Sequence, residues 1–184
     1  MRGLLGNGQP TAMPAHPIIF VSKGLNTLNL SEWFHDQLQA SADGFVWGAQ
    51  QVPNARRNIR PPEALGEWTA ARHIFHMAFY EKNIALPSMY QWLGKACPSL
   101  DDVDEDIAWG EGSDNVESQL AEFKKVRDEQ VQLLARFDDP AWNSTRETIW
   151  RSVTLSWVVS KTYQHTAEHT SDILRLALFW DSWR

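Results

Sequence analysis

The chain has 184 residues, enough for one domain of ordinary size, and its 43% hydrophobic and 22% charged residues are typical of a soluble globular protein. Its formal net charge of −6 argues against nucleic-acid binding, which depends on an excess of Lys and Arg. No stretch approaches the ~20 apolar residues of a membrane span, and the single cysteine, Cys97, excludes an internal disulfide. We therefore expect a cytoplasmic protein with no nucleic-acid or membrane partner.

The N-terminal region differs in composition from the rest of the chain. Residues 1–24 are dense in glycine and proline, which predicts a loose arm, and residues 25–184 are expected to form a single domain. The first helix is predicted over Ser31–Gln51, with Ser31 as its N-cap and Pro53 ending the run.

The second helix is predicted to run from near Glu67 toward Leu93. Pro87 lies inside this run, and we expect it to kink the helix or to end it early, because proline cannot donate a backbone hydrogen bond. The following acidic segment, Asp101–Glu111, contains two glycines at or just beyond its end and is predicted to be a solvated linker.

Two further helices complete the predicted fold. The third is expected to start at Ser113 or Asp114 and to end before Pro140, because apolar residues recur at three- to five-residue steps. The fourth is expected over Thr154–Trp180. Its β-branched start, Val153–Val159, has strand propensity, but the helical period continues through it without a break. Four long helices without a convincing strand predict an all-α four-helix bundle.

Two histidines on the predicted fourth helix are the strongest functional signal. His165 and His169 are four residues apart, so both rings project from one face, and that face is otherwise largely apolar. Two neutral imidazoles in a core compete with packing unless something joins them. A shared metal ion can do so, because each ring offers one lone pair. The alternative is a pair of hydrogen-bonded core histidines.

A third ligand has to come from another helix, and His76 on the second helix is the best candidate. Polar residues near it on the helical wheel form a seam beside apolar rows, which is typical of a lined pocket. His73, one turn earlier, is the alternative ligand, or else a surface histidine or one that supports a ligand from behind. Three histidines with an open fourth position would resemble a catalytic zinc site. We expect one divalent ion, zinc or nickel, with manganese or iron as further options.

Two segments carry short, spaced motifs. In GEWTAARHIFHMAFYEK, the pattern is Trp68 followed by Thr69, then His76, then the acidic Glu81. The second segment, VTLSWVVSKTYQHTAEHTSDIL, contains the pair His165 and His169. The first segment resembles the second-helix motif of the DinB/YfiT-like superfamily, and the second resembles the last metal-binding helix of that superfamily. The resemblance implies an up-down-down-up bundle, often a homodimer, that holds one divalent metal with His76, His165 and His169.

The superfamily includes enzymes that use low-molecular-weight thiols such as bacillithiol, mycothiol or glutathione. The resemblance therefore implies a metal-dependent thiol S-transferase, whose partners are a small thiol and an electrophile. Arg72, Tyr80 and Arg146 are candidates for orienting the substrate, and no catalytic residue is identified. Two alternatives stay open: a metal-dependent hydrolase, and a noncatalytic bundle that binds a metal or small ligand, for example in a stress response.

Overall fold

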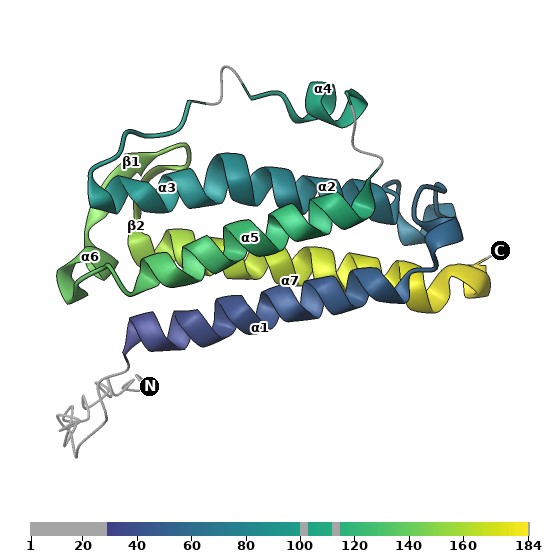
Figure 1. Ribbon diagram of the computed structural model, residues 1–184, viewed down its shortest axis with the longest axis horizontal. Helices are drawn as coiled ribbons and strands as arrows, with labels where there is room; N and C mark the ends of the chain where they lie inside the picture. Colours follow the sequence, from purple (N-terminus) through teal and green to yellow (C-terminus); the bar gives the residue numbers. More distant parts are fainter. Residues whose placement is uncertain (1–28, 100–102, 112–114, 184) are drawn as a thin grey trace, which may run out of the picture.

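The computed structural model describes residues 29–99, 103–111 and 115–183, which form long helices lying side by side (Figure 1). The elements, in chain order, are α1 (Leu30–Gln51), η1 (Asn54–Arg56), η2 (Glu63–Leu65), α2 (Ala70–Tyr80), η3 (Glu81–Ala85), α3 (Leu86–Tyr90), η4 (Gln91–Leu93), α4 (Glu105–Gly110), α5 (Val116–Leu134), α6 (Asp139–Asn143), β1 (Thr145–Thr148), β2 (Arg151–Thr154), α7 (Leu155–Phe179) and η5 (Trp180–Trp183). The predicted arm over residues 1–24 lies outside the described residues.

The predicted four-helix bundle is confirmed, including its direction pattern. Helices α1 and α7 run one way, whereas the α2–α3 run and α5 run the opposite way, which is an up-down-down-up order (Figure 1). Helix α1 packs along α7 and α5, and α2 packs along α5 and α7. Because α3 and α5 follow each other in the same direction, the segment between them returns along the bundle. Helix α4 lies on this return path and contacts α2.

The N-terminal cap of the first helix differs from the prediction. Asn29 is the cap, because its side-chain oxygen accepts a hydrogen bond from the backbone N–H of Glu32 at 3.3 Å. Ser31 instead donates from Oγ to the carbonyl of Leu134 at 3.0 Å, a contact between α1 and the end of α5. The predicted N-cap, Ser31, is therefore wrong, because its hydroxyl is engaged in a contact with another helix.

The other helix starts follow the same capping rule. Thr69 caps α2, so that helix begins at Ala70 and not near Glu67, and Thr154 caps α7 close to the predicted start. The predicted starts of the third helix, Ser113 and Asp114, lie outside the described residues, and α5 begins with Asn115 as its cap.

Pro87 neither ends the second helical run nor leaves it regular. A π-helical segment, η3, separates α2 from α3 and ends just before Pro87. The N–H of Leu86 reaches back five residues to the carbonyl of Glu81. A wider turn at this point accommodates a ring that would clash with a carbonyl four residues earlier. The helical path therefore continues through η4, and Gly94 ends it with a left-handed backbone, φ +82°.

Several short elements were not predicted. Strands β1 and β2 form a hairpin in which Thr145 pairs with Thr154 and Thr148 pairs with Arg151. This small sheet is confined to the connection before α7 and leaves the helical bundle intact. The acidic segment predicted to be a solvated linker contains helix α4, capped by Asp104, whose side chain accepts from two backbone N–H groups.

The core lies between the helices and is mostly apolar. Its largest fully buried apolar side chains are Leu38, Phe45, Ile74, Met77, Met89, Phe123, Leu134, Leu155, Ile173 and Leu176. Two polar side chains, Arg127 and Gln130, are equally buried in its middle. Burial of these apolar surfaces is the main stabilising term, and it holds α2 and α7 in fixed relation to each other.

Candidate metal centre

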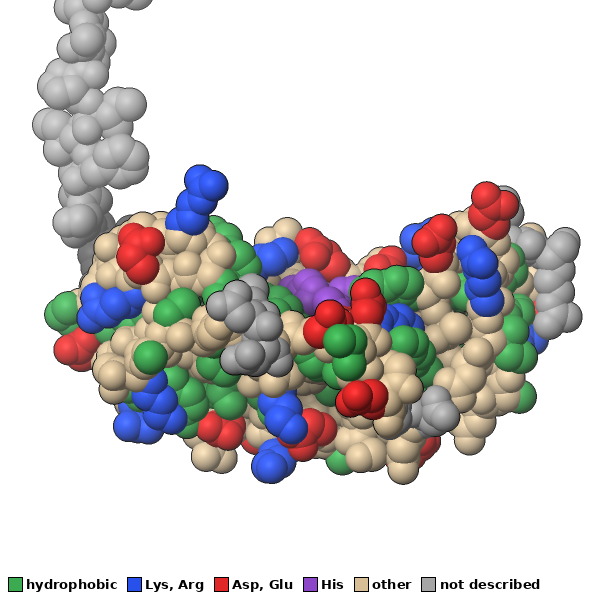
Figure 2. Space-filling model, turned by 90° about the horizontal axis from the view of Figure 1, so that it is seen from above, with side chains coloured by type: hydrophobic (Ala, Val, Ile, Leu, Met, Phe, Trp, Pro, Cys, Tyr) green, Lys and Arg blue, Asp and Glu red, His purple; other side chains and the backbone are tan. Residues whose placement is uncertain are grey.

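Histidine side chains are visible in a hollow on one face of the molecule (Figure 2). His165 and His169 come from α7, one turn apart on the same side of the helix. His165 is 9% exposed, and His169 is partly buried. The apolar residues of α7 that enter the core also turn this pair of rings toward α2.

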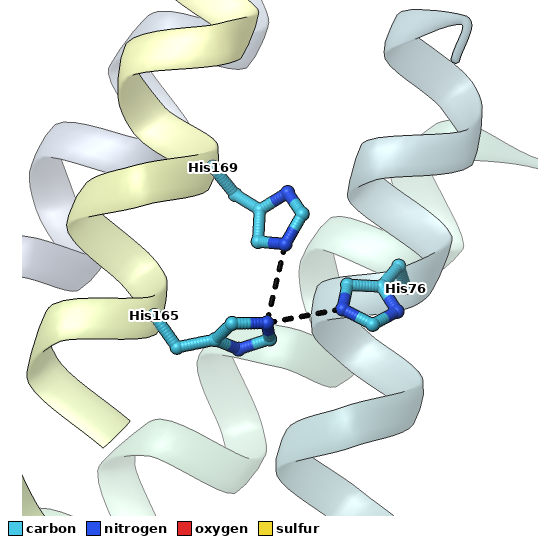
Figure 3. Close-up of side chains that lie close together, drawn as sticks. All are labelled: His76, His165 and His169. Atoms are coloured by element: carbon cyan, nitrogen blue, oxygen red, sulfur yellow. Dashed lines mark hydrogen bonds between the residues drawn. The ribbon is translucent and has the colours of Figure 1, made fainter. Parts of the chain in front are cut away.

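The structure brings His76 on α2 to this pair. His76 Nε2 lies 3.1 Å from His165 Nε2, and His169 Nε2 lies 3.2 Å from the same atom (Figure 3). One nitrogen from each ring lies within 4.8 Å of the other two, so the three residues could hold a metal ion. All three predicted ligands therefore meet at one point.

The spacing of these nitrogens fits a metal ion. Two nitrogen ligands ~2.05 Å from zinc and separated by an angle of about 100° lie about 3.1 Å apart. The distances of 3.1 and 3.2 Å between the histidine nitrogens agree with that arrangement.

Hydrogen bonds alone do not satisfy the three rings. A neutral imidazole has one N–H and one lone pair. Both oxygens of Glu105 lie 2.9 Å from His76 Nδ1, so we assign the proton of His76 to Nδ1 and a lone pair to Nε2. His165 Nε2 can donate to His76 or to His169, but not fully to both. A cation would accept a lone pair from each ring, so the donor set fits a divalent metal.

Glu105 is held in turn by a basic residue. Arg72 Nη2 lies 3.0 Å from Glu105 Oε1 and 2.8 Å from Asp106 Oδ1. The guanidinium stacks against the rings of Trp68 and Trp109, each 5.2 Å away. Helix α4 is thereby attached to α2 next to the histidines. A carboxylate behind a ligating histidine orients the ring and increases its basicity.

Trp68 covers the histidines from one side. Its ring stacks on His169 at 6.0 Å with an interplanar angle of 12°, and it lies 5.1 Å from His76 and 5.3 Å from His73. An indole in this position limits the ring orientations of three histidines and keeps water from that side of the cluster.

His73 is not a surface residue. It is only 8% exposed, and its Nδ1 lies 2.9 Å from Nδ1 of His169. Because His73 contacts the ring nitrogen of His169 that faces away from His165, it supports the three-histidine group from behind. His35, in contrast, is exposed and pairs with Asp36.

Burial sets the protonation of the cluster. It lowers the pKa of His165 to about 3 and that of His73 to about 4, with the electrostatic influence of the nearby His76 adding to the effect in each case. The pKa of His169 is lowered by the same two kinds of cause, burial first and then the neighbouring histidines. These rings are therefore neutral at pH 7, which is the form that binds metal.

Tyr80 lies beside the cluster and carries an unused hydroxyl. Its ring centroid is 4.1 Å from that of His165. Its buried Oη has no hydrogen-bond partner among the described residues. Burial, with the negative charge of Glu81, raises the pKa of the Tyr80 hydroxyl, so the group keeps its proton and can donate a hydrogen bond.

An open cavity of about 460 Å³ lies beside Trp68, whose ring is 5.1 Å from that of His76. Its lining includes Trp68, Thr69, Arg72, Asp106 and Trp109. Arg72 Nη1 is buried and has no hydrogen-bond partner in the described part of the chain. The cavity therefore has aromatic and charged walls, and it shares Trp68 with the surroundings of the histidines.

A family model described as the DinB superfamily matches residues 36–173. The chain belongs to the DinB superfamily. A search of curated proteins finds no significant match for it.

Solved structures with this fold agree with the family. The DinB-superfamily chain superposes on YfiT from Bacillus subtilis, described as a probable metal-dependent hydrolase with an unusual four-helix bundle topology, with TM-score 0.68 and 18% identity over 84% of this chain and 89% of that one. It also superposes on a mycothiol-dependent maleylpyruvate isomerase with TM-score 0.64 and 17% identity over 78% of this chain. The match spans only 60% of the isomerase chain. At these identities the likeness shows the fold alone.

Glu81, the acidic residue of the DinB-like segment, forms a buried ion pair. Arg127 Nη2 donates to Glu81 Oε1 at 2.7 Å and to Thr166 Oγ1 at 2.8 Å, and Gln130 donates to Glu81 Oε2 at 2.6 Å. Both charged side chains are 0% exposed. Since Tyr80 and His165 directly precede Glu81 and Thr166 in sequence, this network joins η3, α5 and α7 next to two residues at the histidine cluster.

Two of the three residues predicted to orient the substrate lie beside the histidines, and the third does not. Arg72 and Tyr80 lie at the histidine cluster. Arg146 is exposed on β1, where Nη1 donates to the carbonyl of Thr145 at 2.9 Å. The described residues show no contact between Arg146 and the cluster.

Two acidic residues near the histidines were not predicted from the sequence. Glu105 lies in the acidic segment predicted to be solvated, and nothing in its local pattern distinguishes it from neighbouring acids. Asp172 follows His169 by three residues on α7, a spacing that places both on one face and could have identified it.

None of the helices in the described ranges has the length and hydropathy that a membrane span requires.

Proposed function

We propose that this chain is a divalent-metal-dependent S-transferase that joins a low-molecular-weight thiol, through its sulfur, to an electrophile. In this proposal His76, His165 and His169 hold the metal ion. The observation that carries it is the convergence of three imidazole nitrogens, at 3.1 and 3.2 Å, where histidine side chains line a hollow on the surface. When bound, a divalent cation supplies the positive charge that lowers the pKa of a thiol and favours the thiolate at neutral pH.

The chain's own residues prepare the site for such chemistry. Glu105 accepts a hydrogen bond from Nδ1–H of His76 and so keeps the Nε2 lone pair directed at the other histidines. Trp68 excludes water from one side of the rings. Hydrogen-bonding groups held in fixed positions, with an aromatic ring on one side, can stabilise the charge that develops during the reaction without reorganisation of solvent.

Two donors next to the site are available to a substrate. The hydroxyl of Tyr80 and Nη1 of Arg72 are buried and unpaired among the described residues. Arg72 suits a carboxylate or carbonyl oxygen, and Tyr80 can donate to an oxygen of the electrophile nearer His165. The likeness to a mycothiol-dependent isomerase supports a thiol as the cosubstrate.

The test uses cobalt-substituted protein in a Cys97→Ser background, because Cys97 is exposed and would itself react. Adding bacillithiol, mycothiol or glutathione should produce a sulfur-to-cobalt charge-transfer band. Transfer of that thiol to monochlorobimane should require metal and should fall to background in His76→Ala, His165→Ala and His169→Ala. His35→Ala, which changes an exposed histidine, is the matched control. Thiols that leave the cobalt spectrum unchanged and give no metal-dependent transfer would refute the thiol proposal.

Metal-assisted hydrolysis is the second candidate. It is favoured by the likeness to YfiT, a probable metal-dependent hydrolase, over 89% of that chain. The same histidines would then lower the pKa of water instead of a thiol. A panel of ester, amide and phosphoester substrates with zinc-loaded protein tests it. Turnover without added thiol favours hydrolysis, and a saturated cobalt spectrum with neither activity favours a noncatalytic binding bundle.

A further inference from the structure

We propose that His73, His169 and Asp172 form a second divalent-cation site that shares the His169 ring with the first. This inference rests on the proposed function only in that His169 is also a ligand of the first site. One nitrogen from each ring and a carboxylate oxygen of Asp172 lie within 4.8 Å of one another. Two histidines and one carboxylate suit zinc, cobalt, manganese or iron.

The two facing helices supply both sites in register. Helix α2 carries His73 one turn before His76. Helix α7 carries His165, then His169, then Asp172 at steps of four and three residues. Side chains at these steps lie along one face of a helix, so the two groups of ligands form adjacent levels of the same interface.

The nitrogen spacing in the second group fits metal coordination. His73 Nδ1 and His169 Nδ1 are 2.9 Å apart. Two nitrogens ~2.05 Å from one cation at a right angle are about 2.9 Å apart. The carboxylate is not fully engaged elsewhere, because its ion pair with Arg175 on the same helix is long, at 3.6 Å between Asp172 Oδ1 and Arg175 Nη1.

The two ring nitrogens of His169 point to different partners. Nε2 lies 3.2 Å from His165 Nε2, whereas Nδ1 lies 2.9 Å from His73 Nδ1. With a cation on each side, His169 would give up its remaining ring proton to solvent and bridge the two ions as an imidazolate. The simpler alternative is one hydrogen bond from His169 Nδ1–H to His73 with no second ion.

Zinc stoichiometry distinguishes these alternatives without any assay of activity. Metal-free full-length protein is dialysed against excess zinc, and bound zinc is measured by mass spectrometry. We expect two zinc ions per chain in the wild type and one in His73→Gln and in Asp172→Asn. His35→Gln should keep two, since His35 lies on the exposed side of α1. Circular dichroism melts confirm that each variant folds.

A second measurement tests the bridge itself. Two copper(II) ions joined by an imidazolate couple magnetically, so the wild type should show a weakened copper resonance that regains full intensity in Asp172→Asn. One zinc ion in both the wild type and His73→Gln would overturn the second site and leave the first intact. One zinc in the wild type and none in His73→Gln would make His73 a ligand of the first site and would also overturn it. No zinc in the wild type would overturn both sites.

Discussion

Both carboxylate oxygens of Glu105 lie 2.9 Å from Nδ1 of His76, which precedes it by 29 residues. The contact joins α4 to α2 at the point where α2 meets α7. His76 has a 15% exposed side chain and Glu105 a 24% exposed one, so the pair is largely shielded from solvent. It fixes the ring tautomer of His76 and therefore the direction of the lone pair that a metal would use.

Removing this carboxylate should weaken metal binding. We expect Glu105→Ala to lower zinc affinity by roughly 10–100-fold, because outer partners of ligating histidines contribute about that much. Glu105→Gln should lose less, since its amide oxygen still accepts from His76 Nδ1–H. Competition with a chromophoric chelator measures both. Glu111→Gln, an exposed acid at the end of the same helix, is the control, and equal affinities in all four proteins would contradict this role.

Metal removal should lower thermal stability without unfolding the protein. An ion that binds only the folded state stabilises it by about 2.7 kcal/mol at a hundredfold excess over Kd. For a chain of this length that corresponds to a shift in Tm of roughly 5–11 °C. Melts with zinc and with chelator measure the shift. The metal-free protein should still melt cooperatively, because the apolar core is formed without the histidines.

A non-cooperative melt in chelator would mean that the metal is required for folding, as in zinc fingers. An unchanged Tm would mean that the folded state holds no ion.

The metal-free protein should lose stability as the pH falls. The pKa of His165 is about 3 and that of His73 about 4 in the folded state, against about 6.5 when unfolded. Between these values the unfolded chain binds more protons, so the free energy of unfolding decreases as pH falls from about 6.5. Above about pH 6.5 both rings are neutral in the folded and unfolded states, so they no longer make the free energy of unfolding depend on pH.

Urea denaturation of metal-free protein at pH 7.5, 6.5, 5.5 and 4.5 measures this dependence. The double variant His73→Gln and His165→Gln removes both groups, so its curve should be flatter than that of the wild type over this interval. Parallel curves would show that these two rings do not titrate as their burial implies.

Breaking the buried ion pair should be among the most destabilising single changes. Glu81→Ala leaves the charge of Arg127 buried without its carboxylate, which we expect to cost about 3–5 kcal/mol. Lys82→Ala is the matched control, because its pair with Glu122 has side chains that are 58% and 31% exposed. That change should cost less than about 1 kcal/mol. Urea denaturation compares them, and similar midpoints for the two variants would be inconsistent with this assignment.

The sequence by itself determined the features that depend on local periodicity. The long helices follow from apolar residues at helical spacing, and the shared face of His165 and His169 follows from their four-residue step. The DinB-like pattern also predicted His76 as their partner, and the three rings meet in the structure. The direction of each helix was predicted from this resemblance, since the spacing of apolar residues does not specify how helices are arranged relative to one another.

Only the tertiary structure decided which distant groups meet. Glu105 is one of several acids in a polar segment. Its contact with His76 depends on where α4 packs against α2. Arg127 sits on a helix face whose pattern does not distinguish it from exposed basic residues, yet it is fully buried because Glu81 and Thr166 lie opposite it. Side chains brought together by packing share no sequence period, so their pairing is specified by the close-packed core and not by local spacing.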